Sequence, residues 1–121
     1  LELAAVDPAQ AEAGRLLPPT VVLDPPDDLH LMQEEIFGPI LPIRGYARLD
    51  EALETVARRD RPLALYPFSH DRDTVERIIG STLAGGITVN DTLLHFAVHR
   101  LPFGGVGPSG MGQYHGRAGF D

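Results

Sequence analysis

The segment of residues 33–39 combines residue types that could bind a ligand. It reads Gln-Glu-Glu-Ile-Phe-Gly-Pro and leads into an apolar run. Because successive side chains of an extended segment point to opposite faces, Glu35 and Phe37 would share one side. A carboxylate accepts hydrogen bonds from two hydroxyl groups and an aromatic face offers stacking, which together suit a polyol joined to a flat ring. The alternative is a solvated pair of glutamates beside a core phenylalanine.

A second set of candidates lies between residues 90 and 116. His95 and His99 are four residues apart, a spacing that places two zinc ligands on one helix face. No glutamate stands between them and no third ligand lies at a helpful distance, so we expect no metal site. The surroundings of Ser109 lack the second glycine of a nucleophile elbow, so we expect no hydrolase.

Glycines are dense in residues 101–112. Residues 105–110 formally satisfy G-x-G-x-x-G, but no apolar strand precedes them and Pro108 interrupts them, which argues against a dinucleotide fingerprint. A glycine-rich segment can instead pass close to a ligand or to another backbone. Both alternatives remain open from the sequence.

The composition excludes several classes of function. The chain has 121 residues and 43% apolar content, which suits one compact domain. Its 10 basic and 17 acidic residues give a net charge of −7, the wrong sign for a nucleic-acid partner. There is no cysteine, hence no disulfide and no thiol nucleophile within this stretch. No long apolar run or leader is present, so we expect no membrane segment and a cytoplasmic location.

Hydrophobic patterning predicts four short strands and two helices. The strands are expected at residues 20–23, 40–43, 63–66 and 87–90. One apolar stripe predicts a helix at 50–59 with Asp50 as its N-cap. A second stripe predicts a helix after Asp73, which with Glu76 fits a capping box, ending near Gly80 or at Ala84.

The order of these elements predicts an α/β fold with an open, mainly parallel sheet and flanking helices. Short apolar strands that alternate with helices pair in parallel through right-handed crossovers. Ligands of such sheets bind beyond the carboxyl ends of the strands. Asn90 lies at such an end.

Four motifs carry a resemblance to a known family. They are QEEIFGP at 33–39, TVND at 88–91, LPFGG at 101–105 and SGMGQYHG at 109–116. With the strands and helices between them, they resemble the C-terminal part of the catalytic domain of an NAD(P)-dependent aldehyde dehydrogenase. The form of the tail resembles the class 3 and coniferyl aldehyde branch. The resemblance runs from about Gly14 to the end of the chain.

The resemblance implies roles for particular residues. Glu35 matches the acid that holds the nicotinamide ribose hydroxyls, and Phe37 matches the ring beside the nicotinamide of NAD or NADP. Phe103 corresponds to a ring at the aldehyde pocket, and three further candidates surround it: Asn90, His95 and Tyr114. The implied mechanism is attack of a cysteine thiolate on the aldehyde, hydride transfer to the nicotinamide, and hydrolysis to the acid.

The chain departs from the family pattern in lacking the catalytic cysteine, the general base and the Rossmann domain. We therefore expect a fragment that is inactive alone and that belongs to a longer, homo-oligomeric enzyme, a dimer. The alternative hypothesis is a non-catalytic binding or assembly module with a dehydrogenase-derived fold. The reading frame upstream of Leu1 would separate these hypotheses.

Overall fold

The computed structural model describes residues 8–14 and 16–120. The chain divides into two compact units, Leu1–Tyr46 and Ala47–Asp121. None of the helices in the described ranges has the length and apolar character needed to span a bilayer.

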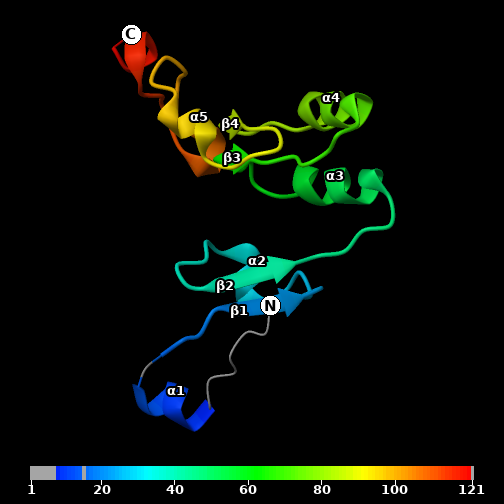
Figure 1. Cartoon of the computed structure of the whole chain (residues 1–121), viewed down its shortest axis with the longest axis vertical. Helices are drawn as coiled ribbons and strands as arrows, with labels where there is room; N and C mark the ends of the chain where they lie inside the picture. Colours follow the sequence, from blue (N-terminus) through cyan, green and yellow to red (C-terminus); the bar gives the residue numbers. More distant parts are fainter. Residues whose placement is uncertain (1–7, 15, 121) are drawn as a thin grey trace. The chain divides into compact units, whose positions relative to one another are not determined.

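The first unit is built on a pair of parallel strands (Figure 1). Its elements are α1 (Pro8–Gly14), β1 (Thr20–Leu23), α2 (His30–Gln33) and β2 (Ile40–Ile43). Both strands have the predicted bounds, and the register pairs Thr20 with Ile40 and Leu23 with Ile43. Pro42 cannot donate to a ladder, which predicts a strand end, a sheet edge or a bulge. It lies in β2, whose only ladder among the described residues is with β1, so the sheet edge is the one observed.

A turn after β1 directs the chain toward α2, as the Asp-Pro-Pro-Asp-Asp sequence predicts. Asp24 has a positive φ of 45°, and its Oδ1 accepts a hydrogen bond of 2.8 Å from the Gly45 N–H. Arg44 donates to the Pro25 carbonyl at 2.7 Å and pairs with Asp27 at 2.8 Å. The turn is therefore tied to the chain that leaves β2. The single-turn helix α2, which the sequence did not predict, follows it.

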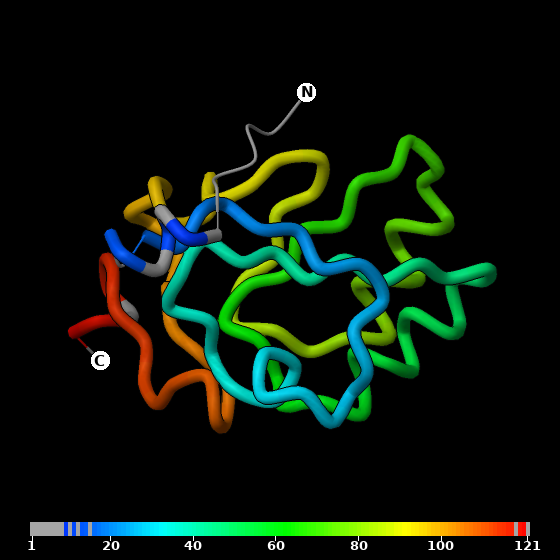
Figure 2. Tube along the Cα trace, turned by 90° about the horizontal axis from the view of Figure 1, so that it is seen from below, coloured from blue at the N-terminus to red at the C-terminus, as the bar shows by residue number. Residues whose placement is uncertain are grey.

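The second unit contains a shorter parallel pair. Its elements are α3 (Leu49–Ala57), β3 (Ala64–Leu65), α4 (Arg72–Ser81), β4 (Gly86–Ile87), α5 (Leu94–Ala97), η1 (Gly107–Ser109) and η2 (Gly116–Gly119). Backbone hydrogen bonds continue the pairing beyond the strands, since Gly85 donates to Pro62 and Asn90 donates to Pro67. The orange part of the trace in Figure 2 then doubles back through an antiparallel bridge between Phe103 and Tyr114.

Both predicted helices are present, but neither predicted N-cap is correct. The N-cap of α3 is Arg48, so Asp50 lies inside the first turn, where it pairs with Arg77 of α4. The N-cap of α4 is Asp71, which has the extended backbone that a cap needs and accepts a hydrogen bond from the Thr74 N–H. Asp73 is already helical there. The helix ends at Ser81, one residue after Gly80.

The α/β class and the parallel pairing are confirmed. The strands form two pairs, one in each unit, where the sequence predicted one open sheet. Among the described residues, no large apolar side chain is fully buried. One face of the β1–β2 pair exposes Val21, Leu23, Leu41 and Ile43 by 44–70%. This face consists of apolar side chains, as the covered faces of parallel sheets normally do. It therefore has the composition of an interior surface.

Acidification is expected to weaken the start of α4. The Thr74 hydroxyl and the Thr74 N–H both donate to the Asp71 carboxylate, which lowers the pKa of Asp71 below the usual aspartate range. With a lowered native pKa, the capping contribution is present above the unfolded pKa and is lost as the pH falls through the native pKa. The Thr74 amide resonance should therefore shift with an acidic midpoint in an NMR titration.

The Asp71→Asn variant is the control for this titration. Asparagine caps helices about as well as aspartate but does not titrate, so most of the acidic shift at Thr74 should disappear. An unchanged titration of Thr74 in this variant would show that another carboxylate causes it.

Candidate functional site

Glu35 and Phe37 lie on an open segment between α2 and β2. The segment leaves α2 at Glu34 with extended φ and ψ of −117° and 159°. The Phe37 side chain is 91% exposed and Glu35 is also exposed, whereas Ile36 between them is half-buried. This alternation is the one expected of an extended segment. The Phe37 ring is not a core residue of its unit, which disagrees with the structural alternative considered from the sequence.

The two adjacent carboxylates of this segment differ in their partners. Glu34 Oε1 lies 3.1 Å from His30 Nδ1, so this carboxylate closes the end of α2. No hydrogen bond or ion pair to another described residue holds the Glu35 carboxylate. Glu35 therefore keeps its full capacity to accept hydrogen bonds.

Asn90 ends the parallel pairing of the second unit, as predicted. Its side-chain amide accepts from the Ser69 N–H at 2.8 Å and donates to the Ser69 carbonyl at 2.9 Å. Its φ is 58°, in the left-handed region that asparagine tolerates. The amide thus joins the carboxyl ends of two neighbouring chain segments, and Asn90 is absent from the lining of the cavity described below.

Phe103 lies at the centre of a cluster of rings. The His95 ring stacks on it at 5.7 Å between centroids, and the Phe96 and Tyr114 rings meet it edge-on at 5.2 Å and 5.3 Å. The His115 ring lies 5.9 Å away. We call these five residues the Phe103 cluster. Three of the four predicted pocket residues therefore come together in the structure, and Asn90 does not join them.

A backbone bridge fixes two members of the cluster. The N–H groups of Phe103 and Tyr114 each donate to the carbonyl of the other residue at 2.8 Å. Directly opposed residues of an antiparallel pair hold their side chains close together. The sequence did not predict this bridge, because a single pair of bonds leaves no strand-like periodicity.

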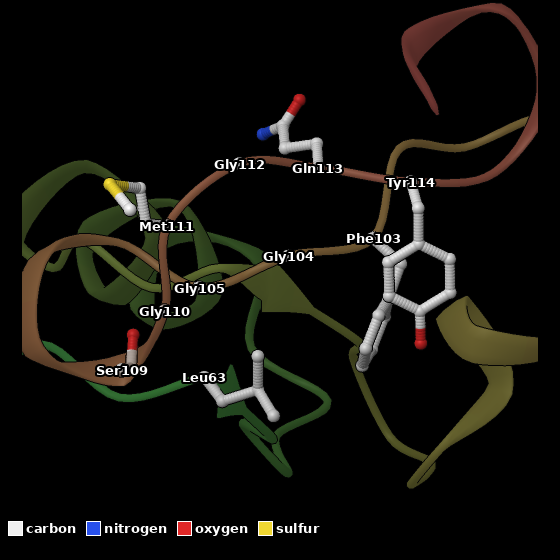
Figure 3. A pocket seen from close by; sticks show the side chains of 10 residues that line it. All are labelled: Leu63, Phe103, Gly104, Gly105, Ser109, Gly110, Met111, Gly112, Gln113 and Tyr114. Atoms are coloured by element: carbon white, nitrogen blue, oxygen red, sulfur yellow. The ribbon is translucent and has the colours of Figure 1, made fainter. Parts of the chain in front are cut away.

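A cavity of about 360 Å³ adjoins these two rings (Figure 3). Its lining residues are Leu63, Phe103, Gly104, Gly105, Ser109, Gly110, Met111, Gly112, Gln113 and Tyr114. Figure 3 shows the Phe103 and Tyr114 rings side by side at one end, and Ser109 and Met111 at the other. The Ser109 hydroxyl accepts from the Val106 N–H and donates to the Val106 carbonyl, so it closes the turn.

Close backbone packing explains the glycines of this wall. A Cβ atom on Gly105 would lie 2.3 Å from the Ser109 carbonyl, and one on Gly104 would lie 2.2 Å from the Gly112 carbonyl oxygen. Such separations are too short for any side chain. Of the two interpretations of the glycine-rich sequence, approach to another backbone is therefore confirmed at these positions.

His95 and His99 do not share a helix face. The helix α5 ends at Ala97, so His99 lies beyond it. In the described part of the chain, no group of three or more His, Cys, Asp or Glu side chains is arranged to hold a metal ion.

Comparison with known proteins identifies the family. The model of the family described as "Aldehyde dehydrogenase family" matches residues 3–121. The chain belongs to the aldehyde dehydrogenase family. It is 56% identical over 106 residues to "Probable coniferyl aldehyde dehydrogenase" of Caulobacter vibrioides, covering 88% of this chain and 22% of the relative. It is 51% identical over 110 residues to "Aldehyde dehydrogenase family 3 member A2" of Rattus norvegicus, covering 91% and 23%.

The fold agrees with that of a solved structure. The substrate-bound state of Staphylococcus aureus AldH aligns with a TM-score of 0.80 and 49% identity, covering 90% of this chain and 24% of that one. The resemblance to the class 3 and coniferyl branch is confirmed by the names of the two relatives. The chain spans less than a quarter of the length of these proteins.

The close backbone contact at Gly105 can be tested in a chimera in which this chain replaces the matching segment of the C. vibrioides relative. Gly105→Ala should destabilise the chimera by about 1–3 kcal/mol, because the new methyl group forces the facing backbone apart. Thermal unfolding followed by calorimetry measures the effect as a lower melting temperature.

Gly80→Ala is the matched control. Gly80 lies in α4, and no atom approaches the position of its Cβ within 4 Å. Alanine should therefore stabilise the helix by up to about 1 kcal/mol. A melting temperature that changes in the same direction in both variants would contradict the assignment of Gly105 to backbone packing.

Proposed function

We propose that this chain supplies the nicotinamide-ribose wall and part of the aldehyde pocket of an NAD(P)-dependent aldehyde dehydrogenase. The observation that carries the proposal is the state of two neighbouring side chains in a family motif. The Phe37 ring is 91% exposed, and the Glu35 carboxylate has no partner among the described residues. An exposed ring and an unused acceptor are suited to a ligand that covers the first and donates to the second.

These two side chains fit the nicotinamide half of NAD or NADP. The carboxylate of Glu35 would accept hydrogen bonds from both ribose hydroxyls, since each of its oxygens has two acceptor sites. The ring of Phe37 would pack beside the planar nicotinamide and limit its tilt. When bound, the cofactor supplies the hydride acceptor. The role of this wall is to hold that acceptor in one orientation.

The second unit would supply the aldehyde side. Phe103 and Tyr114 present adjacent rings to the cavity, and such a wall favours flat aromatic aldehydes of the coniferyl type. His95 packs behind Phe103. Asn90 would support the pocket indirectly, because its side-chain amide makes two hydrogen bonds to the Ser69 backbone and holds that segment in place.

The nucleophile would come from outside these residues, because the 121-residue sequence has no cysteine. In the proposed enzyme, a cysteine elsewhere attacks the aldehyde to form a thiohemiacetal, and the product is the carboxylic acid. The cytoplasmic location and the homodimer remain predictions of the sequence for that enzyme.

The first test compares the chain with the chimera. The 121-residue chain should not reduce NAD or NADP in the presence of coniferaldehyde, whereas the chimera should do so at a rate within about tenfold of the C. vibrioides parent, a loss of up to ~1.4 kcal/mol. Absorbance at the wavelength of the reduced nicotinamide measures both. Activity of the chain alone, or a folded chimera without activity, would contradict the proposal and favour a non-catalytic module.

The second test addresses Glu35. In the chimera, Glu35→Gln should slow hydride transfer by about tenfold to a hundredfold, because a neutral amide replaces a charged acceptor of the ribose hydroxyls. Single-turnover measurement of nicotinamide reduction isolates this step.

Glu34→Gln is the matched control for this substitution. The Glu34 carboxylate is engaged with His30 rather than available to a ligand, so its substitution should change the rate by less than about twofold, within the small effect of an exposed pair. Equal rates for the two variants would show that Glu35 has no special role.

A further inference from the structure

We propose that His95 is a positioning residue that sets the orientation of the Phe103 ring at the aldehyde pocket. The inference rests on the proposed function, because it takes Phe103 to contact the aldehyde. His95 itself is absent from the residues that line the cavity, whereas Phe103 lines it. Any effect of His95 on the aldehyde would therefore pass through Phe103.

The His95 ring is fixed to one face of the chain at β4. Gly86 and Thr88 are two residues apart, so in an extended segment they face the same side. The Thr88 hydroxyl lies 2.9 Å from His95 Nδ1, a hydrogen bond that sets the angle of the imidazole. A Cβ atom on Gly86 would lie 2.6 Å from His95 Cδ2 and 2.9 Å from Nε2. The ring therefore occupies the space that any other residue at position 86 would fill.

The other ring nitrogen of His95 makes no hydrogen bond to a described residue. This atom, Nε2, is buried. The Tyr66 ring lies 5.9 Å away at a tilt of 44°. The position of the imidazole therefore depends on Thr88, on the space above Gly86 and on the surrounding rings.

His95 contacts Phe103 differently from the other neighbours. The two rings are within 23° of parallel, whereas the Phe96 and Tyr114 rings meet Phe103 at 79° and 73°. A stacked neighbour resists rotation of the ring plane, because rotation would bring the ring edge into its face. The stacking of His95 thus sets the plane of Phe103, and the edge-on rings set its position.

The proposal predicts a selective effect on aldehyde binding. In the chimera, His95→Leu should raise the KM for coniferaldehyde by about threefold to tenfold, the range expected for a lost ring pair. The KM for the nicotinamide cofactor and kcat should change by less than about twofold, a barrier change below ~0.4 kcal/mol. His70→Leu replaces an exposed histidine outside the cluster and should leave all three constants unchanged.

Two variants at Thr88 test the same mechanism without removing the imidazole. Thr88→Val keeps the shape of the side chain but deletes the hydroxyl, so the KM for coniferaldehyde should rise by about twofold to fivefold, as for one lost hydrogen bond. Thr88→Ser keeps the hydroxyl and should restore the parental KM. Equal KM values in these two variants would overturn the proposal.

A spectroscopic measurement separates this inference from the proposed function. In the 121-residue chain, the ring protons of His95 should carry a ring-current shift that changes strongly in Phe103→Leu, leaving only the contribution of the Tyr66 ring, and that persists in full in Phe37→Leu. Persistence of the full shift in Phe103→Leu would overturn the stacking. If the chain shows the expected shift but the chimera is inactive, the proposed function alone is refuted. If the chimera is active but His95→Leu leaves its KM for coniferaldehyde unchanged, the role of His95 alone is refuted.

Discussion

The second unit depends on a close contact between two backbones, at Gly85 and Gly104. A Cβ atom on Gly85 would lie 2.1 Å from the Gly104 carbonyl oxygen and 2.7 Å from that of Leu63. Gly85 also donates to the Pro62 carbonyl at the start of the parallel pairing. One residue therefore brings together β3, β4 and the segment that carries Phe103. Only glycine permits three backbone segments to approach so closely.

This contact explains how a unit with two-residue strands can position a site. The ladder of β3 and β4 is short, but backbone hydrogen bonds extend it at both ends, from the Gly85 N–H to Pro62 and from the Asn90 N–H to Pro67. The Asn90 side-chain amide adds two hydrogen bonds to Ser69 at the far end. The Phe103–Tyr114 bridge then holds the returning chain. Backbone hydrogen bonds and glycine contacts thus supply order where burial is incomplete, since no large apolar side chain among the described residues is fully buried.

Long periodic patterns were predictable, and local geometry was not. The stripes that predicted α3 and α4 extend over several turns, so their existence follows from hydrophobic periodicity. Their caps depend on single φ and ψ values: the N-cap of α3 is Arg48, which makes no side-chain capping hydrogen bond, and two aspartates compete at the start of α4. Asp71 rather than Asp73 caps α4 because its backbone is extended and its carboxylate faces the Thr74 N–H. Nothing in the spacing of these residues distinguishes the two.

In the candidate site too, one arrangement was predictable from the sequence and another was not. The pairing of Glu35 with Phe37 follows from the alternation of an extended segment, and their exposure agrees with it. The contact of His95 with Phe103 does not follow from the sequence, because it requires Gly86, Thr88 and a return of the chain to meet on one side of β4. A glycine within a strand often marks a close approach, but the strand predicted at 87–90 left Gly86 outside it, whereas β4 includes this residue.

The exposed apolar side chains have a common physical explanation. Burial of apolar surface contributes about 25 cal/mol per Å², so a largely exposed ring such as Phe37 and an open face such as that of β1–β2 forgo substantial stabilisation. The chain spans less than a quarter of the length of the relatives that it matches, and its β1–β2 face has the apolar composition of a surface that parallel sheets normally cover. The exposed Phe37 ring differs from the exposed side chains of the sheet face, because it lies near the Glu35 carboxylate, which has no partner among the described residues. A covering segment without hydrogen-bond donors would leave that charge buried and unpaired, whereas a ligand with hydroxyl groups beside a flat ring would satisfy both side chains.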